Sequence, residues 1–139
     1  MVEKAIGAYK KVLEINPTNL DAKTDLGICY VEGSSTPMQG IMMLRDVVKE
    51  NPEHENAQFN LGVLSIKSGQ FEKAIERFEK VLTINPKRNE AQILLGESYM
   101  KTGNKEKALE NLEKAKKQAT DPQLIQEVSN LISQVNNNH

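Results

Sequence analysis

Residues 55–88 read ENAQFNLGVLSIKSGQFEKAIERFEKVLTINPKR and contain two helical patterns of similar length. In each pattern, apolar residues recur at three- and four-residue steps, which is the spacing of one helical face. Residues 67–70 separate the patterns, and Asn85 and Pro86 close the second. Because neither helix could bury its apolar face alone, the stretch predicts a helical hairpin that packs against neighbours on both sides.

The landmarks of this hairpin recur along the chain at intervals of 34 or 35 residues. A Leu-Gly pair stands at residues 26–27, 61–62 and 95–96, and an Asn-Pro pair at residues 16–17, 51–52 and 85–86. A period in this range is typical of stacked helical hairpins. The pattern therefore predicts an all-α solenoid, whose stability is a sum over its repeats and their interfaces.

The repeat resembles the tetratricopeptide repeat, whose pattern has Leu-Gly in the first helix, a small, an aromatic and a small residue in the second, and a closing proline. The matching positions are Gly62, Ala74, Phe78 and Pro86 in the central repeat, and Gly96, Ala108, Leu112 and Ala115, with weaker choices, in the next. The resemblance covers essentially the whole chain. It implies a right-handed α-α superhelix (solenoid) of helical hairpins with a C-terminal end helix.

The resemblance also divides the chain, which is expected to be a single array. We expect a second helix of a truncated repeat at residues 1–19, complete repeats at 20–54, 55–88 and 89–120, and a C-terminal capping helix with a frayed tail at 121–139. The residues expected to fray are 136–139. Because the first repeat lacks its first helix, we expect the chain to be a fragment of a longer array.

The repeat at residues 20–54 departs from the pattern in the loop between its helices. This loop is one residue longer than the loop at residues 67–70. We expect Gly33 to end the first helix in a left-handed conformation. Thr36 and Pro37 are typical of the N-cap and the first turn of the next helix.

The second helix of that repeat is expected over residues 37–50. Gly40 replaces the small alanine there, which should weaken the helix by about 1 kcal/mol. Met38, Met42 and Met43 also cluster in this helix. Flexible methionines can fill gaps in an imperfect repeat or form a soft binding surface, and we favour gap filling.

Composition argues against several classes of function. The 18 basic and 19 acidic residues give a formal net charge of −1, so there is no basic excess to attract nucleic acid. No apolar run approaches the length of about 20 residues that a membrane span needs. Cys29 is the only cysteine and is interpreted as a small buried hydrophobe. The cytoplasm is favoured as the compartment, and an exported compartment stays open because the native N-terminus is expected to lie further upstream.

Catalytic and metal chemistry also find little support in the sequence. Neither histidine, His54 nor His139, has a second ligand at metal-binding spacing. The chain has no glycine-rich phosphate loop, and its many carboxylates alternate with lysines on helical faces. We therefore expect a non-enzymatic protein without a metal or cofactor, whose role is recognition or assembly.

The family resemblance implies a partner-binding groove lined by the first helix of each hairpin. Carried over position by position, the groove residues are Thr24, Ile28, Val31, Glu32, Phe59, Val63, Ile66, Lys67, Ile93, Glu97, Met100 and Lys101. Some family members grip a chaperone carboxylate tail with a clamp of cations, but Glu90 and Leu94 stand where two of those cations belong. An apolar protein segment or peptide is therefore the expected partner.

Self-assembly is the alternative function. The first helix carries Val2, Ala5, Tyr9 and Val12 on a face that a preceding helix would cover. An uncovered apolar face of this kind tends to find a partner. The sequence thus predicts a homo-oligomer formed through the N-terminal helix as a second possibility.

Overall fold

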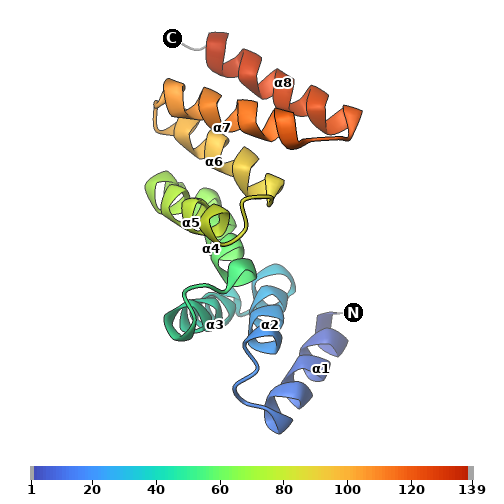
Figure 1. Ribbon diagram of the computed structural model, residues 1–139. Coiled ribbons are helices and arrows are strands. Elements are labelled where there is room, and N and C mark those ends of the chain that lie inside the picture. Colours follow the sequence, from blue (N-terminus) through green and yellow to red (C-terminus); the bar gives the residue numbers. More distant parts are fainter. Residues whose placement is uncertain (1, 138–139) are drawn as a thin grey trace. The chain divides into compact units, whose positions relative to one another are not determined.

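The computed structural model describes residues 2–137, and this part of the chain folds into helices and loops without a strand (Figure 1). The helices are α1 (Val2–Ile15), α2 (Leu20–Gly33), α3 (Pro37–Glu50), α4 (Glu55–Lys67), α5 (Phe71–Ile84), α6 (Asn89–Lys101), α7 (Lys105–Gln118) and α8 (Pro122–Asn137). The predicted all-α class is confirmed, and the described residues contain the expected number of eight helices.

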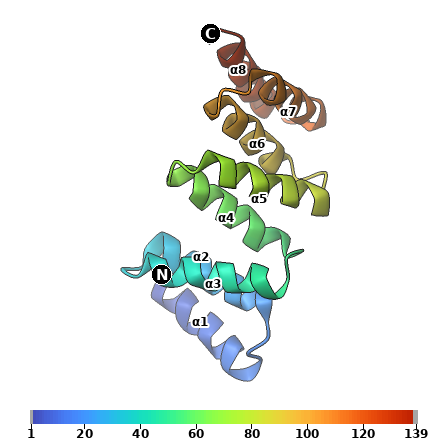
Figure 2. The ribbon, with the colours of Figure 1, turned by 90° about the vertical axis from the view of Figure 1, so that its left-hand side faces the viewer.

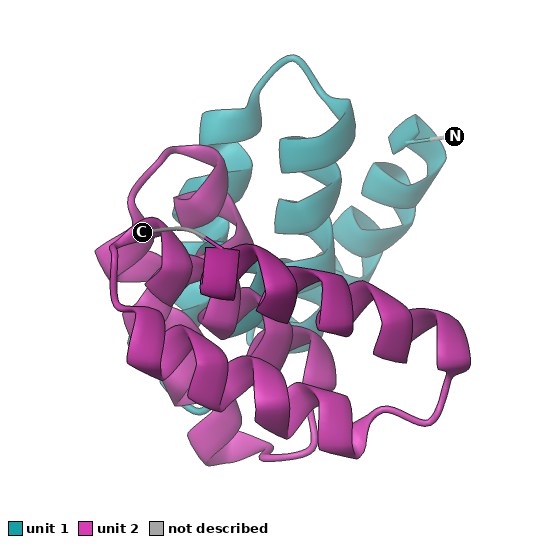
Figure 3. Cartoon of the chain, turned by 90° about the horizontal axis from the view of Figure 1, so that it is seen from above, with its two compact units in different colours: residues 1–61 teal, residues 62–139 magenta. Residues whose placement is uncertain are grey.

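The chain forms two compact units, residues 1–61 and 62–139, and the boundary falls within α4 (Figure 3). In the first unit α1 packs on α2 and α2 packs on α3 (Figure 2). In the second unit α5 packs on α6, α6 on α7 and α7 on α8. Within each unit these helices thus pack on their neighbours in the sequence, as expected of stacked repeats.

The second helices of the hairpins in the second unit bury three equivalent positions. These positions are Ala74, Phe78 and Val81 in α5 and Ala108, Leu112 and Ala115 in α7, none of which exposes any surface. A Cβ added to Gly62 would lie 2.8 Å from the Phe78 ring, and one added to Gly96 would lie 2.7 Å from Cγ of Leu112. The Leu-Gly glycines therefore let a large side chain rest directly on the backbone of the first helix.

The loops after α4 and α6 turn through glycines in the left-handed region. Gly69 has φ of 72° and Gly103 has φ of 82°, which only glycine adopts readily. Gly33 differs, because it lies inside α2 and no positive φ occurs there. The predicted left-handed cap at Gly33 is wrong. Instead the Ser34 hydroxyl closes α2 by donating to the Tyr30 carbonyl at 2.8 Å.

Helices α2 and α3 meet through two glycines. A Cβ added to Gly27 would lie 3.1 Å from the Gly40 carbonyl oxygen, and a Cβ added to Gly40 would clash with the Gly27 carbonyl oxygen. The two backbones are therefore in direct contact, and Leu44 and Val47 are fully buried beside them. Glycine at position 40 has a low intrinsic helix propensity, yet α3 is a regular 14-residue helix. The close contact with α2 leaves no room for a larger residue than glycine at this position.

Helix α1 is packed on one side only. Val2 lies against Gly33 of α2, and the Lys10 ammonium lies 5.9 Å from the centre of the Tyr30 ring. No described residue of α1 is fully buried. Val12 is 38% exposed and Ile15 is 88% exposed, so α1 leaves part of its apolar surface open.

Helix α8 closes the second unit with one apolar and one polar face. Val128 and Val135 are buried, whereas Gln126 and Asn130 are exposed and hydrogen-bonded to each other at 3.0 Å. The Asp121 carboxylate accepts the Gln123 amide at 3.1 Å at the start of the helix. The helix runs to Asn137, two residues into the segment predicted to fray, and residues 138–139 lie outside the described part.

None of the helices within residues 2–137 combines the length and the apolar character needed to cross a membrane.

Candidate protein-interaction site

The groove positions predicted on α2 divide into buried and accessible ones. Thr24 is 1% exposed, and its hydroxyl donates to the Leu20 carbonyl at 2.7 Å. Val31 faces α3, since its Cγ2 methyl lies beside Gly40. Ile28 is half-buried and Glu32 is exposed. Thr24 is therefore a buried packing residue. Ile28 and Glu32 are the predicted α2 positions that keep accessible surface.

Helix α4 shows the same division. Phe59 is 9% exposed, which identifies it mainly as a packing residue. Val63 and Ile66 follow at steps of four and three, are half-buried and therefore keep part of their apolar surface accessible. Lys67 is exposed at the end of the helix.

Helix α6 carries a half-buried stripe that we call the α6 stripe: Ile93, Glu97 and Met100. These residues are spaced by four and three, so they lie along one side of the helix. Leu95, on the opposite side, is 4% exposed. Lys101 is exposed at the C-terminal end of the stripe. The helix thus uses one side for the core and leaves the other partly open.

Glu97 places a carboxyl group among these apolar side chains. Burial raises the pKa of Glu97, and the positive charge of Lys101 acts in the opposite direction. A carboxylate in such an environment is poorly hydrated. It could therefore gain from a positively charged group on a partner that docks on the α6 stripe.

The position of α6 is fixed by polar contacts on its core side. The Tyr99 hydroxyl donates to Oε1 of Glu79 on α5 at 2.6 Å, and the Lys107 ammonium of α7 lies 5.4 Å from the centre of the Tyr99 ring. Burial and the bond to Glu79 raise the pKa of Tyr99 to about 12. At the start of α6, the Asn89 amide donates to the Ala115 carbonyl at 2.9 Å. These contacts tie α6, which carries the α6 stripe, to α5 and α7.

The methionines of α3 are more exposed than predicted. Met38 is 60% exposed and Met42 is 59% exposed, and with Met43 they line an open, mainly apolar recess of about 540 Å³. The gap-filling interpretation is therefore wrong for Met38 and Met42. Met38 and Met42 each stand two residues from Gly40, so they lie on the side of α3 opposite to the contact with α2.

The face of α1 predicted to self-associate is partly covered. Val2 contacts Gly33 of α2, and Ala5 and Tyr9 are half-buried. Val12 is exposed, although the equivalent Val81 of α5 has no exposed surface. The difference arises because α5 has the first helix of its own hairpin beside it and α1 does not.

The described part of the chain contains no group of three histidine, cysteine or carboxylate side chains placed to hold a metal ion.

Comparison with known proteins extends the resemblance. Residues 65–131 match the family model described as tetratricopeptide repeat. RNA polymerase-associated protein CTR9 of Saccharomyces cerevisiae is 35% identical over 79 residues, which is 57% of this chain and 7% of CTR9. Tetratricopeptide repeat-containing protein trd-1 of Caenorhabditis elegans is 27% identical over 74 residues, which is 53% of this chain and 10% of trd-1. The chain thus spans a tenth or less of these curated relatives.

Solved structures of the tetratricopeptide repeat protein MamA share the fold. One crystal structure of MamA superposes with a TM-score of 0.70 at 26% identity, covering 96% of this chain and 76% of the MamA chain. A MamA structure from AMB-1 superposes with a TM-score of 0.67 at 27% identity, covering 84% of this chain and 68% of the other. Residues 65–131 therefore match the tetratricopeptide repeat family, and most of the chain shares the fold of MamA.

Proposed function

We propose that the chain is a non-catalytic adaptor that binds an apolar protein segment on first helices of its hairpins, namely on α6 and on residues 63–67 of α4, all within the second unit. Tetratricopeptide repeats are in general protein-interaction scaffolds, typically without catalysis. The observation that carries the more specific proposal is the α6 stripe. It keeps large side chains partly accessible on a helix whose opposite side is already packed.

The chemistry of the stripe suggests how a partner would bind. A helix with large apolar residues on two sides can make a packing contact on each side. On α6 the protein core takes up one side, which leaves the other for a partner. Ile93 and Met100 would supply apolar anchors, as would Val63 and Ile66 on α4. Interface affinity usually rests on a few such anchors, and charges at the rim, here Lys67 and Lys101, adjust the association rate.

Self-assembly through α1 is the second candidate. It is supported by the exposure of Val12 and Ile15, 38% and 88%, at the end of a helix packed on one side. A second copy could cover Ala5, Tyr9 and Val12. Sedimentation of the wild type and of Tyr9→Glu tests this: a concentration-dependent oligomer that Tyr9→Glu dissolves supports it, and a monomer at high micromolar concentration contradicts it.

Partner capture from a lysate tests the adaptor proposal. The test variant is Val63→Asp combined with Met100→Asp, because both side chains are accessible and neither is a core residue. The control is Glu76→Ala on the exposed side of α5. Phe59 is avoided because it is buried, and Glu79 because it accepts the Tyr99 hydroxyl.

The adaptor proposal predicts that the control captures the same proteins as the wild type and that the double variant loses them. Circular dichroism must show the same helix content for all three proteins. Equal capture by the double variant and the control would contradict binding on these helices. Nucleic acid is not the expected partner, because the formal net charge is −1, and nuclease treatment of the lysate should leave capture unchanged.

A further inference from the structure

Three loops of the chain begin with Asn-Pro, and each leads into the first helix of a repeat. In each loop the asparagine side chain accepts the amide of the residue two positions later. These bonds are Asn16 to Thr18 at 3.3 Å, Asn51 to Glu53 at 3.1 Å and Asn85 to Lys87 at 3.1 Å. The loops are therefore built alike. They differ at their last residue, which is Asn19, His54 or Arg88.

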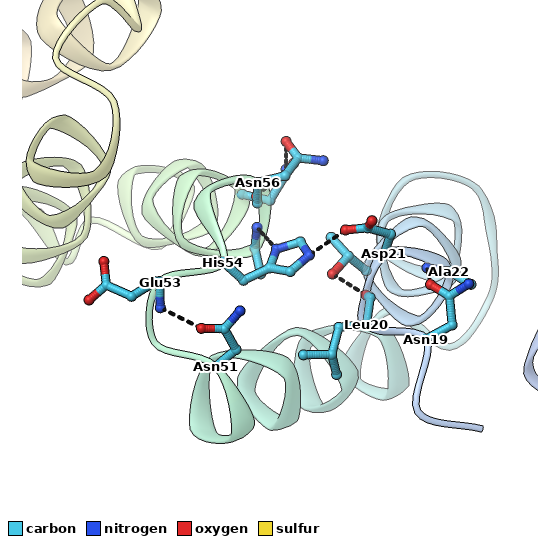
Figure 4. Close-up of polar contacts among 11 residues, drawn as sticks. Asn19, Leu20, Asp21, Ala22, Asn51, Glu53, His54 and Asn56 are labelled. Atoms are coloured by element: carbon cyan, nitrogen blue, oxygen red, sulfur yellow. Dashed lines mark hydrogen bonds and ion pairs between the residues drawn. The ribbon is translucent and has the colours of Figure 1, made fainter. Parts of the chain in front are cut away.

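That last residue is the N-cap position of the helix that follows. Oδ1 of Asn19 accepts the Ala22 amide of α2 at 3.0 Å, and Nδ1 of His54 accepts the Ala57 amide of α4 at 3.2 Å. Arg88 makes no such side-chain bond to α6. His54 thus does for α4 what Asn19 does for α2, but with a side chain that can take up a proton (Figure 4).

The two partners of His54 fix the protonation state of its ring. A backbone amide can only donate, so Nδ1 must be the unprotonated acceptor. Nε2 lies 2.7 Å from Oδ1 of Asp21 on α2, and a carboxylate can only accept, so Nε2 carries the proton. The geometry is that of a neutral imidazole linking the start of α4 to α2 within the first unit. The His54 side chain is 11% exposed, whereas that of Asp21 is 88% exposed.

We propose that protonation of His54 removes the side-chain cap of α4 while the contact with Asp21 is kept, so that the start of α4 loosens in mild acid. A proton on Nδ1 would point at the Ala57 amide and leave the ring no lone pair to offer it. A positive ring is also disfavoured beside the positive end of the helix dipole. Histidine is the side chain that ordinarily changes its charge between about pH 5 and pH 8.

Acidic groups around the ring act in the other direction. Asp21 contacts His54 directly, Asp25 stands one turn further along α2, and Glu53 and Glu55 flank His54 in the sequence. Burial and the charge of Asp21 raise the pKa of Asp25, and His54 opposes this rise. Because protonation would strengthen the pairing with Asp21 while it removes the cap, the two changes oppose each other and global stability is a poor readout. The exchange of the Ala57 amide reports the cap itself.

Hydrogen exchange of the whole chain between pH 8 and pH 5 tests the proposal. Protection factors, which correct for the intrinsic effect of pH on exchange, are expected to fall about 5- to 30-fold at Ala57, the range that corresponds to losing an N-cap. A ¹⁵N spectrum of the imidazole should show the Nε2-protonated neutral ring at pH 8. His139, the other histidine, is replaced by asparagine in every protein so that a single histidine titrates.

Two variants separate the cap from other effects of pH. His54→Asn copies the cap at Asn19 and should abolish the fall in protection at Ala57, because an amide oxygen accepts at any pH. Asp21→Asn leaves the cap in place and should keep the fall. Three outcomes would each overturn the proposal: an Nδ1-protonated ring at pH 8, an equal fall in His54→Asn, or unchanged protection at Ala57 when the ring is charged.

Discussion

In the α2–α3 hairpin the two helices touch backbone to backbone, whereas in the α6–α7 hairpin a leucine side chain fills the crossing. A Cβ added to Gly27 would lie 3.1 Å from the Gly40 carbonyl oxygen and 3.3 Å from Cγ of Leu44, so the backbone is nearest. A Cβ added to Gly96 would lie 2.7 Å from Cγ of Leu112 and 3.4 Å from the Ala108 carbonyl oxygen, so the leucine is nearest. The equivalent of Gly40 in α7 is Ala108, which has no exposed surface. The same repeat pattern therefore accommodates two kinds of close contact where its helices cross.

The difference shows that a glycine in a helix has two separate effects. By intrinsic propensity, Gly40 weakens α3 relative to alanine. By packing, it allows the carbonyl of Gly27 to approach closer than any Cβ would permit. Close packing in protein interiors leaves little room to adjust when an atom is added. Packing should therefore outweigh propensity at Gly40.

The largest effect is expected from removing the leucines that face the first-helix glycines. Leu44 and Leu112 are fully buried at equivalent positions of α3 and α7. Truncation of either to alanine should lower the free energy of unfolding by about 2–5 kcal/mol, as core truncations do. Urea unfolding followed by circular dichroism measures the loss. A loss below about 1 kcal/mol at Leu44 alone, outside the usual range, would mean that backbone contact replaces the leucine in the α2–α3 hairpin.

The next effect separates backbone contact from side-chain contact. Gly40→Ala should cost about 1–3 kcal/mol, as overpacking does, and Leu44→Ala should not relieve this cost because the obstacle is the Gly27 carbonyl oxygen. Gly96→Ala should also be unfavourable alone, because the new Cβ would meet Leu112. Added to Leu112→Ala, it should cost nothing. Double-mutant cycles in urea measure both couplings, and relief of Gly40→Ala by Leu44→Ala would contradict the proposed contact.

A third glycine supplies the matched control. Gly7 lies in α1, and a Cβ added there would meet nothing within 4 Å. Only helix propensity acts at such a site, so Gly7→Ala should raise the free energy of unfolding by about 0.5–1 kcal/mol. The thermal midpoint of the whole chain would show the direction. If Gly7→Ala instead destabilised the protein, a loss of stability in Gly40→Ala could no longer be attributed to the clash with the Gly27 carbonyl.

The smallest effect concerns the accessible sides of α2 and α6, where Ile28 and Glu97 stand at equivalent positions. Because burial raises the pKa of Glu97, folding favours its neutral form. The stabilisation that the protonated Glu97 carboxyl provides is therefore complete when the pH is below the pKa of Glu97 in the unfolded chain. It is lost as the pH rises through the pKa of Glu97 in the folded chain. Glu97→Gln should match the wild type at about pH 3 and be slightly more stable than it at pH 7. Glu72→Gln on α5 serves as the control, and the same pH dependence there would contradict the assignment.

The sequence predicted those features that depend on spacing within one helix. The Leu-Gly pairs and the small-aromatic-small pattern located the helices and their buried faces, and Leu95 and Phe78 are buried as a result. Features that depend on a neighbouring helix were missed. Thr24 and Phe59 were placed in the groove by alignment, but local packing buries both. The cap at His54 was missed because its residue type differs from Asn19, although the position in the loop was the signal that could have found it.

The exposure of Met38 and Met42 is a further feature that residue spacing within one helix does not predict. A methionine at a helical position is compatible with a core or a surface role. Which role it has depends on whether a neighbouring helix covers that side, and Met38 and Met42 are 60% and 59% exposed. Propensity and period alone do not contain that information.

Hydrogen exchange of the chain with and without its captured protein segment, added as a synthetic peptide, tests whether the first helices recognise that segment. Binding along the first helices predicts added protection within residues 63–67 of α4 and 93–101 of α6, and loss of that protection in Val63→Asp/Met100→Asp. Helix α7 should exchange unchanged. Protection confined to α1, or to the exposed sides of α5 and α7, would contradict recognition on these helices and would favour self-assembly or another surface.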